Sequence, residues 1–377
     1  MFGKKLVKWF MLVTNIVAAF LLLITLLGSV LSPEKVIIPA YFSLFYPITI
    51  TVNLAYILFW IASRSWYFLL SLSLMILSAN EISNTFPIHF GYLKKSTSAT
   101  PLNILTYNTR MSGNLVKDTP QHHNNVMQYV LEKNPDIVCL QEFEVSTLDK
   151  YITFNDMMRI FSKYPFKHVE FKGKHYTNIY GIATFSKYPI VNRQRIEFPS
   201  RFNMSISTDI NINGTIIRVF NNHLESNRIT ETDKALSSKL TKKFDAEDIT
   251  DITFYFSHKL GSAYRLRAYQ ADTISQLIAS SPHKVIVCGD FNDVPPSYAY
   301  TKMKGKLKDA YAETGIGFGW TFKEPFYGFR IDYLLYDPSA FTPIQYISDR
   351  VNYSDHYPVL CQFRIHNSNT INNNLKD

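Results

Sequence analysis

The sequence predicts an α/β protein, a sandwich of helix-covered β-sheets preceded by an N-terminal segment of two to three transmembrane helices. Apolar, β-rich runs alternate with helical patterns over about 270 residues, which is typical of sheets covered by helices. Long uncharged stretches near the N-terminus predict the membrane segment. The predicted parts are a membrane segment at 1–91, a linker at 92–100, a folded domain at 101–366 and a polar tail at 367–377.

Three uncharged stretches define the membrane segment. The first has 25 residues between Lys8 and Glu34, the second has 28 between Lys35 and Arg64, and the third has 16 at 65–80. A spanning helix needs roughly 20 apolar residues, with about 17 as a lower bound, so the third stretch is marginal. A cleaved signal peptide is the alternative for the first stretch. Its apolar region exceeds the roughly 7–15 residues of such peptides, and no A-x-A site follows, which favours a retained anchor.

The lysines before the first stretch set the expected orientation. Lys4, Lys5 and Lys8 favour a cytoplasmic N-terminus, because short cytoplasmic loops carry an excess of basic residues. Three spans place the folded domain outside the cytoplasm, and two spans leave it inside. We expect three, and therefore an integral protein of the cytoplasmic or inner membrane with its folded domain on the extracytoplasmic side.

Charge and cysteine content restrict the partners. Outside residues 1–91 the chain has 34 basic and 28 acidic residues, a net charge of +6. This mild basicity favours contact with anionic lipid or a phosphate-bearing substrate but falls short of a dedicated nucleic-acid binder. Cys139, Cys288 and Cys361 all lie in apolar β-like runs. An odd number of buried thiols predicts no disulfide framework. The sequence indicates no obligate protein partner.

The folded domain opens and closes with apolar strands. We expect strands at 102–108, 136–142, 180–186, 205–212, 215–223, 284–290, 330–337 and 356–365.

Two stretches, 119–142 and 265–290, each combine a helix with a following buried strand. In the first stretch Thr119 fits a helix N-cap. The strands end on Glu142 and Asp290, at the edge where open α/β sheets bind ligands. The alternative is a coincidence, since any two helix–strand units resemble each other.

Polar side chains gather at the strand ends. They are Asn108, Glu142, His223, Asp290, Asn292, Asp332, Asp355 and His356. Taken singly, most fit turns or the surface. Asp332 does not, because it lies in an otherwise apolar strand, and a buried carboxylate needs a stabilising partner. His223 and His356 are the available histidines, and an aspartate fixes the tautomer of an imidazole that it contacts.

The residue types at the strand ends indicate which reaction the site would catalyse. They include acids, amides and two histidines but no serine or cysteine nucleophile in a recognisable setting. Oxygen-rich ligands suit Mg²⁺, with Mn²⁺ or Ca²⁺ as alternatives, rather than a closed zinc site. A hard cation with histidines and amides suits phosphate-ester hydrolysis. A helix–loop–helix calcium loop starting at Asp290 is excluded, because Val294 and Pro295 occupy positions that need an oxygen ligand and a glycine.

Seven motifs in one order carry a family resemblance. They read LTYN, QE, YGIATFSKYPI, NNHLES, GDFND, RIDYLL and SDHYPV. Together they resemble the endonuclease/exonuclease/phosphatase superfamily over about residues 100–366. The resemblance implies the deoxyribonuclease I-like fold, a four-layered sandwich of two mixed β-sheets with helices outside.

The resemblance also implies a metal site. Glu142 would be the principal Mg²⁺ ligand, with Asn108 nearby and Asp355 assisting. No other cofactor is implied.

The remaining positions receive catalytic roles by the same resemblance. Asp290 would align or deprotonate the attacking water, and Asn292 would hold a phosphate oxygen. His356, oriented by Asp332, would stabilise the developing phosphorane. His223 would be the acid for the leaving group.

The expected function is therefore a membrane-anchored, divalent-metal-dependent phosphoesterase. Its phosphate-ester substrate is left open between a lipid headgroup, as in sphingomyelinase- or phospholipase C-like enzymes, and nucleic acid. Three aromatic residues near the expected site have three alternative roles: stacking on bases, contacting acyl chains or packing in the core. They are Trp320, Phe322 and Phe326. A non-enzymatic membrane scaffold carrying the sandwich as cargo is the alternative of a different class.

Overall fold

The computed structural model describes residues 2–89, 101–119, 121–227, 232–233, 235–236, 246–323 and 328–366. The predicted linker, the polar tail and Phe326 lie outside these residues. The chain forms two compact units. The helical unit comprises Met1–Ser83, Glu225–Asp272 and Val294–Lys302, and the sandwich unit comprises Asn84–Leu224, Thr273–Asp293 and Met303–Asp377.

Apolar helices dominate the N-terminal part. They are α1 (Phe2–Leu27), α2 (Ile38–Ser43), α3 (Tyr46–Ala62) and α4 (Phe68–Leu77), followed by the polar α5 (Ala79–Thr85). Among the described residues, one helix, Lys5–Val30, is long and apolar enough to cross a membrane. Helix α4 has 10 residues and is therefore about 15 Å long, half the thickness of a hydrocarbon core. The number of spans stays a prediction.

A buried polar network joins helices α1, α3 and α4. Asn15 donates from Nδ2 to Oγ of Ser71 at 2.6 Å, and that hydroxyl donates to Oδ1 of Asn53 at 2.8 Å. Nε1 of Trp60 donates to Oδ1 of Asn15 at 2.8 Å. All four side chains are fully buried. Between apolar helices such hydrogen bonds select one register, because a shifted helix would leave these groups unpaired.

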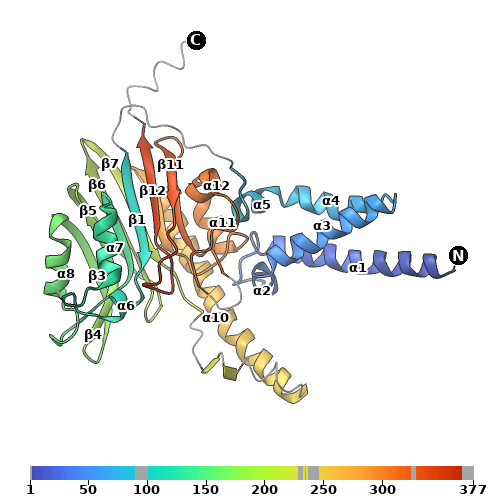
Figure 1. Ribbon diagram of the computed structural model, residues 1–377, viewed down its shortest axis with the longest axis horizontal. Coiled ribbons are helices and arrows are strands. Elements are labelled where there is room, and N and C mark those ends of the chain that lie inside the picture. The colour runs from blue at the N-terminus through green and yellow to red at the C-terminus, as the bar shows by residue number, and fades with distance from the viewer. Residues whose placement is uncertain are drawn as a thin grey trace, which may run out of the picture. The chain divides into compact units, whose positions relative to one another are not determined.

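The sandwich unit contains two six-stranded sheets (Figure 1). The first has the order β11-β12-β1-β2-β4-β3 and the second β5-β6-β7-β8-β10-β9. The strands of the first are β1 (Leu102–Asn108), β2 (Ile137–Ser146), β3 (Phe166–His175), β4 (Asn178–Ser186), β11 (Phe341–Ile347) and β12 (Val359–Ile365). Those of the second are β5 (Ile190–Ile196), β6 (Met204–Ile212), β7 (Thr215–His223), β8 (Lys284–Asp290), β9 (Lys308–Asp309) and β10 (Asp332–Tyr336).

Both sheets are mixed. The pairs β1–β2 and β7–β8 run parallel, whereas the neighbouring pairs are antiparallel, including β1–β12 in the first sheet. Each parallel pair directs two carboxyl strand ends to the same edge, and β2 and β8 are the strands of the two helix–strand stretches.

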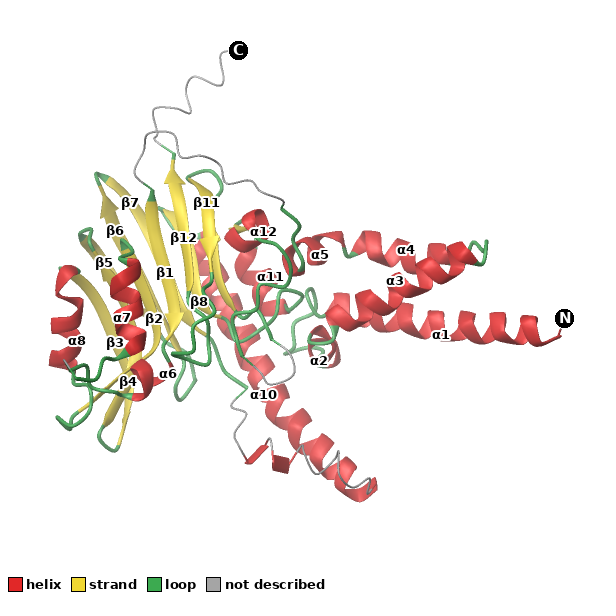
Figure 2. Cartoon of the chain, viewed as in Figure 1, coloured by secondary structure: helices red, strands yellow, loops and turns green. Residues whose placement is uncertain are grey.

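The core lies between the sheets. Ile104 and Cys139 of the first sheet belong to the same buried cluster as Val219 and Cys288 of the second. The alternate residues of β1 and β2 face outward, and α7 (Asn125–Lys133) and α8 (Phe154–Ile160) cover them (Figure 2). Helix α12 (Ala310–Thr314) contacts β10. The remaining helices are α6 (Arg110–Asn114), α10 (Ala246–Ala279) and α11 (Tyr298–Lys304), with a 3₁₀ turn at Phe161–Lys163. Two mixed sheets flanked by helices confirm the predicted fold class, and the three cysteines are buried and free, as expected.

One predicted helix start is wrong. Helix α7 begins at Asn125, and Oδ1 of Asn124 accepts the backbone N–H of Met127 at 3.3 Å. Thr119 instead closes a turn with His122. Asparagine satisfies an N-terminal N–H as well as threonine does, so the asparagine immediately before the apolar face takes the cap.

Candidate active site

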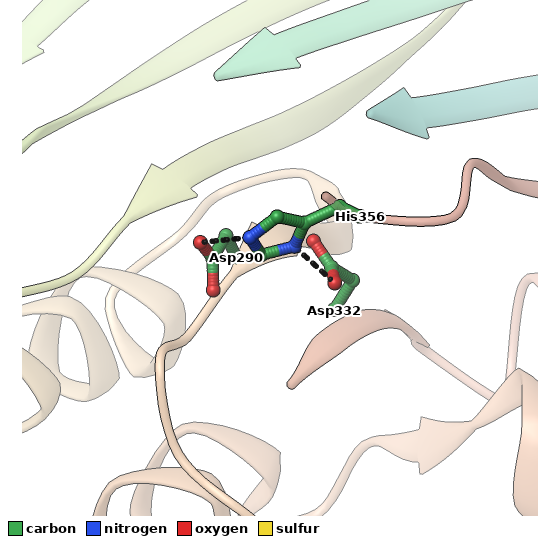
Figure 3. Close-up of side chains that lie close together, drawn as sticks. All are labelled: Asp290, Asp332 and His356. Atoms are coloured by element: carbon green, nitrogen blue, oxygen red, sulfur yellow. Dashed lines mark hydrogen bonds and ion pairs between the residues drawn. The ribbon is translucent and has the colours of Figure 1, made fainter. Parts of the chain in front are cut away.

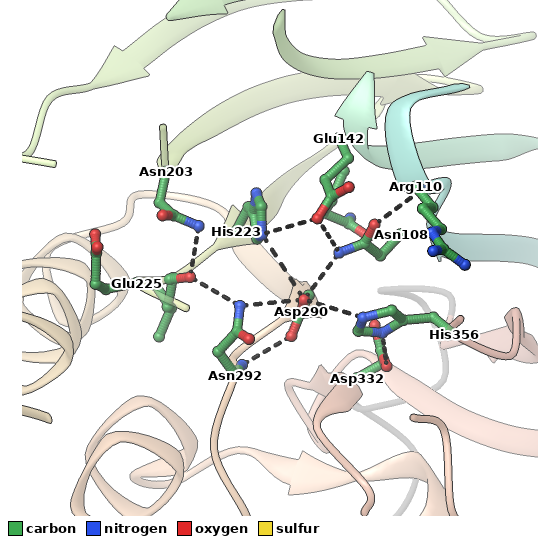
Figure 4. A network of polar contacts seen from close by, with 12 residues as sticks. Asn108, Arg110, Glu142, Asn203, His223, Glu225, Asp290, Asn292, Asp332 and His356 are labelled. Carbon is green, nitrogen blue, oxygen red and sulfur yellow. Dashed lines mark hydrogen bonds and ion pairs between the residues drawn. The ribbon is translucent and has the colours of Figure 1, made fainter. Parts of the chain in front are cut away.

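The predicted residues converge on one edge of the sandwich unit, where strands of both sheets end (Figure 4). Asn108 ends β1 beside Gln141 of β2, and His223 ends β7 beside Asp290 of β8. Packing the two sheets face to face brings these two ends together. The site is therefore built by tertiary contact between residues far apart in sequence.

Asn108 links the two sheets. Its Nδ2 donates to Oε1 of Glu142 at 3.3 Å and to Oδ2 of Asp290 at 3.0 Å. Its Oδ1 accepts the backbone N–H of Arg110 at 3.2 Å, and its carbonyl accepts the hydroxyl of Ser354. Asn108 thus presents nitrogen rather than oxygen to both carboxylates. In this orientation Asn108 holds the two carboxylates, and its place beside a metal stays a prediction.

A β-bulge aims Glu142 into the site. Its φ is +50°, and the pairing of β2 with β4 shifts register between Leu140 and Phe143. The preceding Gln141 is fully buried and donates from Nε2 to Oδ1 of Asn221 at 2.6 Å. Bulges next to active sites commonly redirect one side chain in this way.

The electrostatic surroundings of Glu142 are short of positive charge. Burial and the nearby Asp355 carboxylate raise the pKa of Glu142, while His356 and the hydrogen bond from Asn108 lower it only in part. A carboxylate whose pKa is raised by neighbouring carboxylates is a position where a bound cation would be favourable.

A glycine and an asparagine shape the turn that carries Asp290. Gly289 has φ +122°, and a Cβ there would lie 2.0 Å from the carbonyl oxygen of Asn222, so only glycine fits. Asn292 has φ +53° and donates its backbone N–H to Oδ1 of Asp290 at 2.8 Å. Its Nδ2 donates to Oδ2 of Asp290 at 3.2 Å and to the carbonyl of Leu224 at 2.9 Å. Asn292 therefore fixes the Asp290 carboxylate directly.

Three side chains form a buried chain of contacts (Figure 3). Nδ1 of His356 lies 2.8 Å from Oδ2 of Asp332, and Nε2 lies 3.7 Å from Oδ2 of Asp290. Burial lowers the pKa of His356, but the carboxylates of Asp332 and Asp290 outweigh burial and raise this pKa to about 10. Burial also raises the pKa of Asp290 to about 6, against the lowering effect of His356. His356 is thus held as an imidazolium at neutral pH.

A loop outside the predicted set supports this pair. Oγ1 of Thr321 accepts the backbone N–H groups of both Ile331 and Asp332 at 3.0 Å. The ring of Phe322 lies 4.9 Å from the ring of His356, tilted by 56°. Thr321 holds the start of β10, and Phe322 covers the imidazole.

The last two predicted residues lie at different depths. Nε2 of His223 is 3.8 Å from Oδ2 of Asp290 and 4.0 Å from Oε1 of Glu142. Asp355 lies at the rim, where Oδ2 is 3.8 Å from Nε of Arg110 and both side chains are partly exposed. The structure therefore brings all eight predicted residues to one edge of the sandwich, with Asp355 outermost.

The oxygen donors fit a hard divalent cation. Among the described residues, Asp290, Asp332 and His356 form the one group of three or more histidine, cysteine or acidic side chains whose ligand atoms all lie within 4.8 Å of one another. His356 directs Nδ1 to Asp332 and Nε2 to Asp290, so both of its ring nitrogens face carboxylates. Outside this group, the carboxylate of Glu142 lies near that of Asp355, which together with burial raises the pKa of Glu142. Carboxylate oxygens are the donors that Mg²⁺ and Ca²⁺ prefer.

Sequence comparison assigns this site to a family. The model of the Endonuclease/Exonuclease/phosphatase family matches residues 105–356. The chain belongs to this family. Members of the family hydrolyse phosphate esters. A second model, a domain of unknown function (DUF8431), matches residues 7–85. A search of curated protein sequences found no match.

Three solved structures are similar to this chain. An endonuclease/exonuclease/phosphatase from Beutenbergia cavernae is 15% identical, with 72% of this chain and 73% of that chain covered and a TM-score of 0.49. The human Nocturnin catalytic domain with bound sulfate is 17% identical, with 71% and 94% covered and a TM-score of 0.46. The 3' phosphatase NExo from Neisseria, bound to product DNA hairpin, is 16% identical, with 70% and 99% covered and a TM-score of 0.47.

Several residues that support the candidate active site were not predicted from the sequence. Thr321 accepts the N–H groups of Ile331 and Asp332. Ser354 donates to the carbonyl of Asn108 and accepts the N–H of His356. Ser354 had a signal, because it directly precedes Asp355 and His356 in a motif already singled out. Arg110 and Thr321 had none, since each contact depends on tertiary structure.

Proposed function

We propose that this protein is a membrane-anchored, divalent-metal-dependent phosphoester hydrolase. The observation that carries the proposal is the Asp332–His356–Asp290 chain, in which a buried imidazolium lies 3.7 Å from a carboxylate of raised pKa. Buried groups with strongly shifted pKa values at converging strand ends are typical of acid–base catalysis. The long apolar Lys5–Val30 helix supports the anchor.

The proposed metal is Mg²⁺, with Mn²⁺ or Ca²⁺ as alternatives, held chiefly by Glu142 with Asp355 assisting. When bound, such an ion would polarise a phosphoryl oxygen and offset the charge of the surrounding carboxylates. Asn108 would hold Glu142 and Asp290 in place through its amide nitrogen.

In the proposed reaction, Asp290 aligns a water molecule and takes its proton, while the water oxygen forms a bond to phosphorus. Negative charge then develops on the phosphoryl oxygens, and His356 stabilises it as a charged donor oriented by Asp332. His223 gives a proton to the leaving oxygen as its bond to phosphorus breaks. Asn292 already uses its amide hydrogens on Asp290 and Leu224, so a contact with a phosphate oxygen would exchange one of these bonds.

The test uses the full chain in detergent. We expect EDTA-sensitive hydrolysis of bis-p-nitrophenyl phosphate that Mg²⁺ restores, and its loss in His356→Ala. Circular dichroism controls for the fold of the variant. A panel of sphingomyelin vesicles, phosphatidylcholine vesicles, DNA and RNA separates the lipid substrate from the nucleic-acid alternative. If no substrate in the panel shows EDTA-sensitive hydrolysis, the proposal that the protein is an enzyme is wrong, and the membrane-scaffold alternative is favoured.

The proposed sidedness has its own test. We propose that the sandwich lies on the extracytoplasmic side, as three spans would require. Protease added outside intact cells or spheroplasts should then cleave it. Resistance to the protease in intact cells, with cleavage after lysis, would place it in the cytoplasm.

A further inference from the structure

An uncharged, apolar ridge lies on the surface of the sandwich unit. We call it the aromatic ridge, and its members are Phe86, Ile88, Ile316, Phe318 and Trp320, which are 39%, 58%, 57%, 37% and 43% exposed. Single exposed apolar residues are ordinary, but a contiguous group of them marks an interaction site.

Backbone pairing and ring contacts hold the two halves of the ridge together. Ile88 forms an antiparallel bridge with Ile316, and the N–H of Gly317 donates to the carbonyl of Pro87 at 3.0 Å. The rings of Phe86 and Phe318 meet edge to face at 4.9 Å, and Phe318 stacks on Trp320 at 6.1 Å. The ridge is therefore an ordered surface rather than a set of unrelated side chains.

The aromatic ridge adjoins the candidate active site. Trp320 directly precedes Thr321, whose hydroxyl accepts the N–H of Asp332, and Phe322 follows with its ring against His356. Two residues of extended chain span at most about 7 Å. A molecule held at Trp320 is thus close to the residues proposed to act on phosphorus.

Two observations indicate what covers the ridge. Phe86 follows the apolar helix α4, which ends at Leu77, by nine residues, and a chain of that length reaches no farther than about 30 Å. The exposed Arg350 donates from Nη1 to the carbonyl of Trp320 at 2.6 Å. Aromatic rings beside a cation are typical of the interface between a bilayer and water, where the cation meets lipid phosphates.

We propose that the aromatic ridge rests in the interfacial layer of the bilayer that holds the apolar helices, and that it presents a bilayer-borne phosphoester to the site. The inference rests on the anchoring in the proposed function. It narrows the substrate class to esters at a lipid surface. A protein partner or a second copy of the chain on the ridge would be a different result of the test below.

The first experiment measures lipid contact on the full chain in phosphatidylcholine vesicles. A thiol-reactive, environment-sensitive dye is attached to Ile316→Cys. Its control is Val191→Cys, which replaces a β-branched residue on β5 with a similar exposure of 52%. The three native cysteines are fully buried, so the introduced thiol is the one that reacts.

We expect a blue shift for the label at 316 and quenching by nitroxide lipids at least about twofold stronger than at 191. Failure of the chain to float with the vesicles would overturn the anchor and the inference together. A floating chain with equal quenching at both positions would overturn the ridge contact alone. A blue shift without lipid quenching would assign the ridge to a protein partner or a second copy.

The second experiment separates substrate delivery from chemistry. Ile316→Asp should reduce hydrolysis of sphingomyelin or phosphatidylcholine in the vesicles about tenfold, because a charge opposes insertion into the interface. Hydrolysis of soluble bis-p-nitrophenyl phosphate should stay unchanged, and Val191→Asp should alter neither rate. Equal losses on both substrates would show that Ile316 supports the site itself and would overturn the delivery role.

Discussion

Nδ1 of His356 lies 2.8 Å from Oδ2 of Asp332, and the two residues lie at the ends of strands from different sheets. Asp332 begins β10 of the second sheet, and His356 precedes β12 of the first. The pair forms only when the sheets are packed together. Its geometry is therefore a property of the whole sandwich and not of either strand.

Replacement of the buried carboxylate tests this pair. Asp332→Asn keeps the shape but removes the charge that orients and protonates His356, so we expect kcat on bis-p-nitrophenyl phosphate to fall by about 100-fold or more. Asp337→Asn, just beyond the other end of β10, should leave kcat unchanged. Equal rates for wild type and Asp332→Asn would show that the pair only stabilises the fold.

Metal affinity should depend on the residue at the β-bulge. Glu142→Gln removes the charge of the principal proposed ligand, and we expect about 10- to 100-fold weaker activation by Mg²⁺ in a rate-versus-metal titration. Glu144→Gln, two residues along β2 and buried, is the control and should titrate like wild type. An unchanged Mg²⁺ midpoint in Glu142→Gln would remove Glu142 from the metal site.

The loop beneath Asp332 should matter for stability. Thr321→Val takes away the acceptor of two buried N–H groups, which we expect to lower the free energy of unfolding by about 1–3 kcal/mol. Thr321→Ser retains the hydroxyl and should keep most of that stability. The midpoint of thermal unfolding in detergent measures both, and an unaffected Thr321→Val would show that other acceptors replace the hydroxyl.

Alanine substitutions at two glycines distinguish the effect of steric contact from the effect of backbone strain on stability. Gly289→Ala and Gly214→Ala both place a side chain at positive φ, +122° and +93°. Only the Cβ at 289 meets other atoms, at 2.0 Å from Asn222, while the position at 214 is open. We expect Gly214→Ala to cost about 1 kcal/mol and Gly289→Ala to cost more and to reduce hydrolysis, because β7 and β8 must separate beside Asp290. Similar thermal midpoints and rates for the two variants would contradict the close packing.

A buried histidine away from the site predicts a pH dependence of stability. His168 is 1% exposed, with Nδ1 at 2.8 Å from the hydroxyl of Thr208. Burial, aided by Arg193, lowers its pKa from 6.5 to about 4. A lowered pKa means that the unfolded chain binds the proton more tightly. The stabilisation is thus full above pH 6.5 and declines towards pH 4, where about 3 kcal/mol is lost.

The corresponding measurement compares thermal midpoints at pH 7 and pH 4.5. His168→Asn keeps a polar atom near Thr208 but does not titrate, so its midpoint should fall less on acidification than that of wild type. His122→Asn, at an exposed position, should follow wild type. Parallel decreases in wild type and His168→Asn would show that another group causes the acid sensitivity.

Interior strands could be predicted from the sequence, and edge strands could not. The strands 102–108, 215–223 and 284–290 have the predicted bounds, because their apolar runs are buried between layers. Strand β5, with the sequence IVNRQRI, lies at a sheet edge and is largely exposed, so it lacks the apolar pattern that identifies a strand.

The residues of the site could likewise be predicted from the sequence, but not all of the contacts and orientations of their side chains. Strand-end position was enough to select Asn108, Glu142 and Asp290. It did not show which atom of Asn108 faces the carboxylates or that Glu142 lies in a bulge, because both depend on contacts between strands. The role of Thr321 depends on a loop that approaches β10 from outside the motifs.

The antiparallel pairing of β1 with β12 has a practical consequence. Leu102, where the chain enters the first sheet, lies opposite Phe363, near where it leaves, and paired residues of this kind are about 5 Å apart. The site lies at the other end of these strands, which are about 23 Å long. Entry and exit are thus neighbours on the side remote from catalysis. A label or tag attached at this end of the first sheet would therefore leave the catalytic edge open.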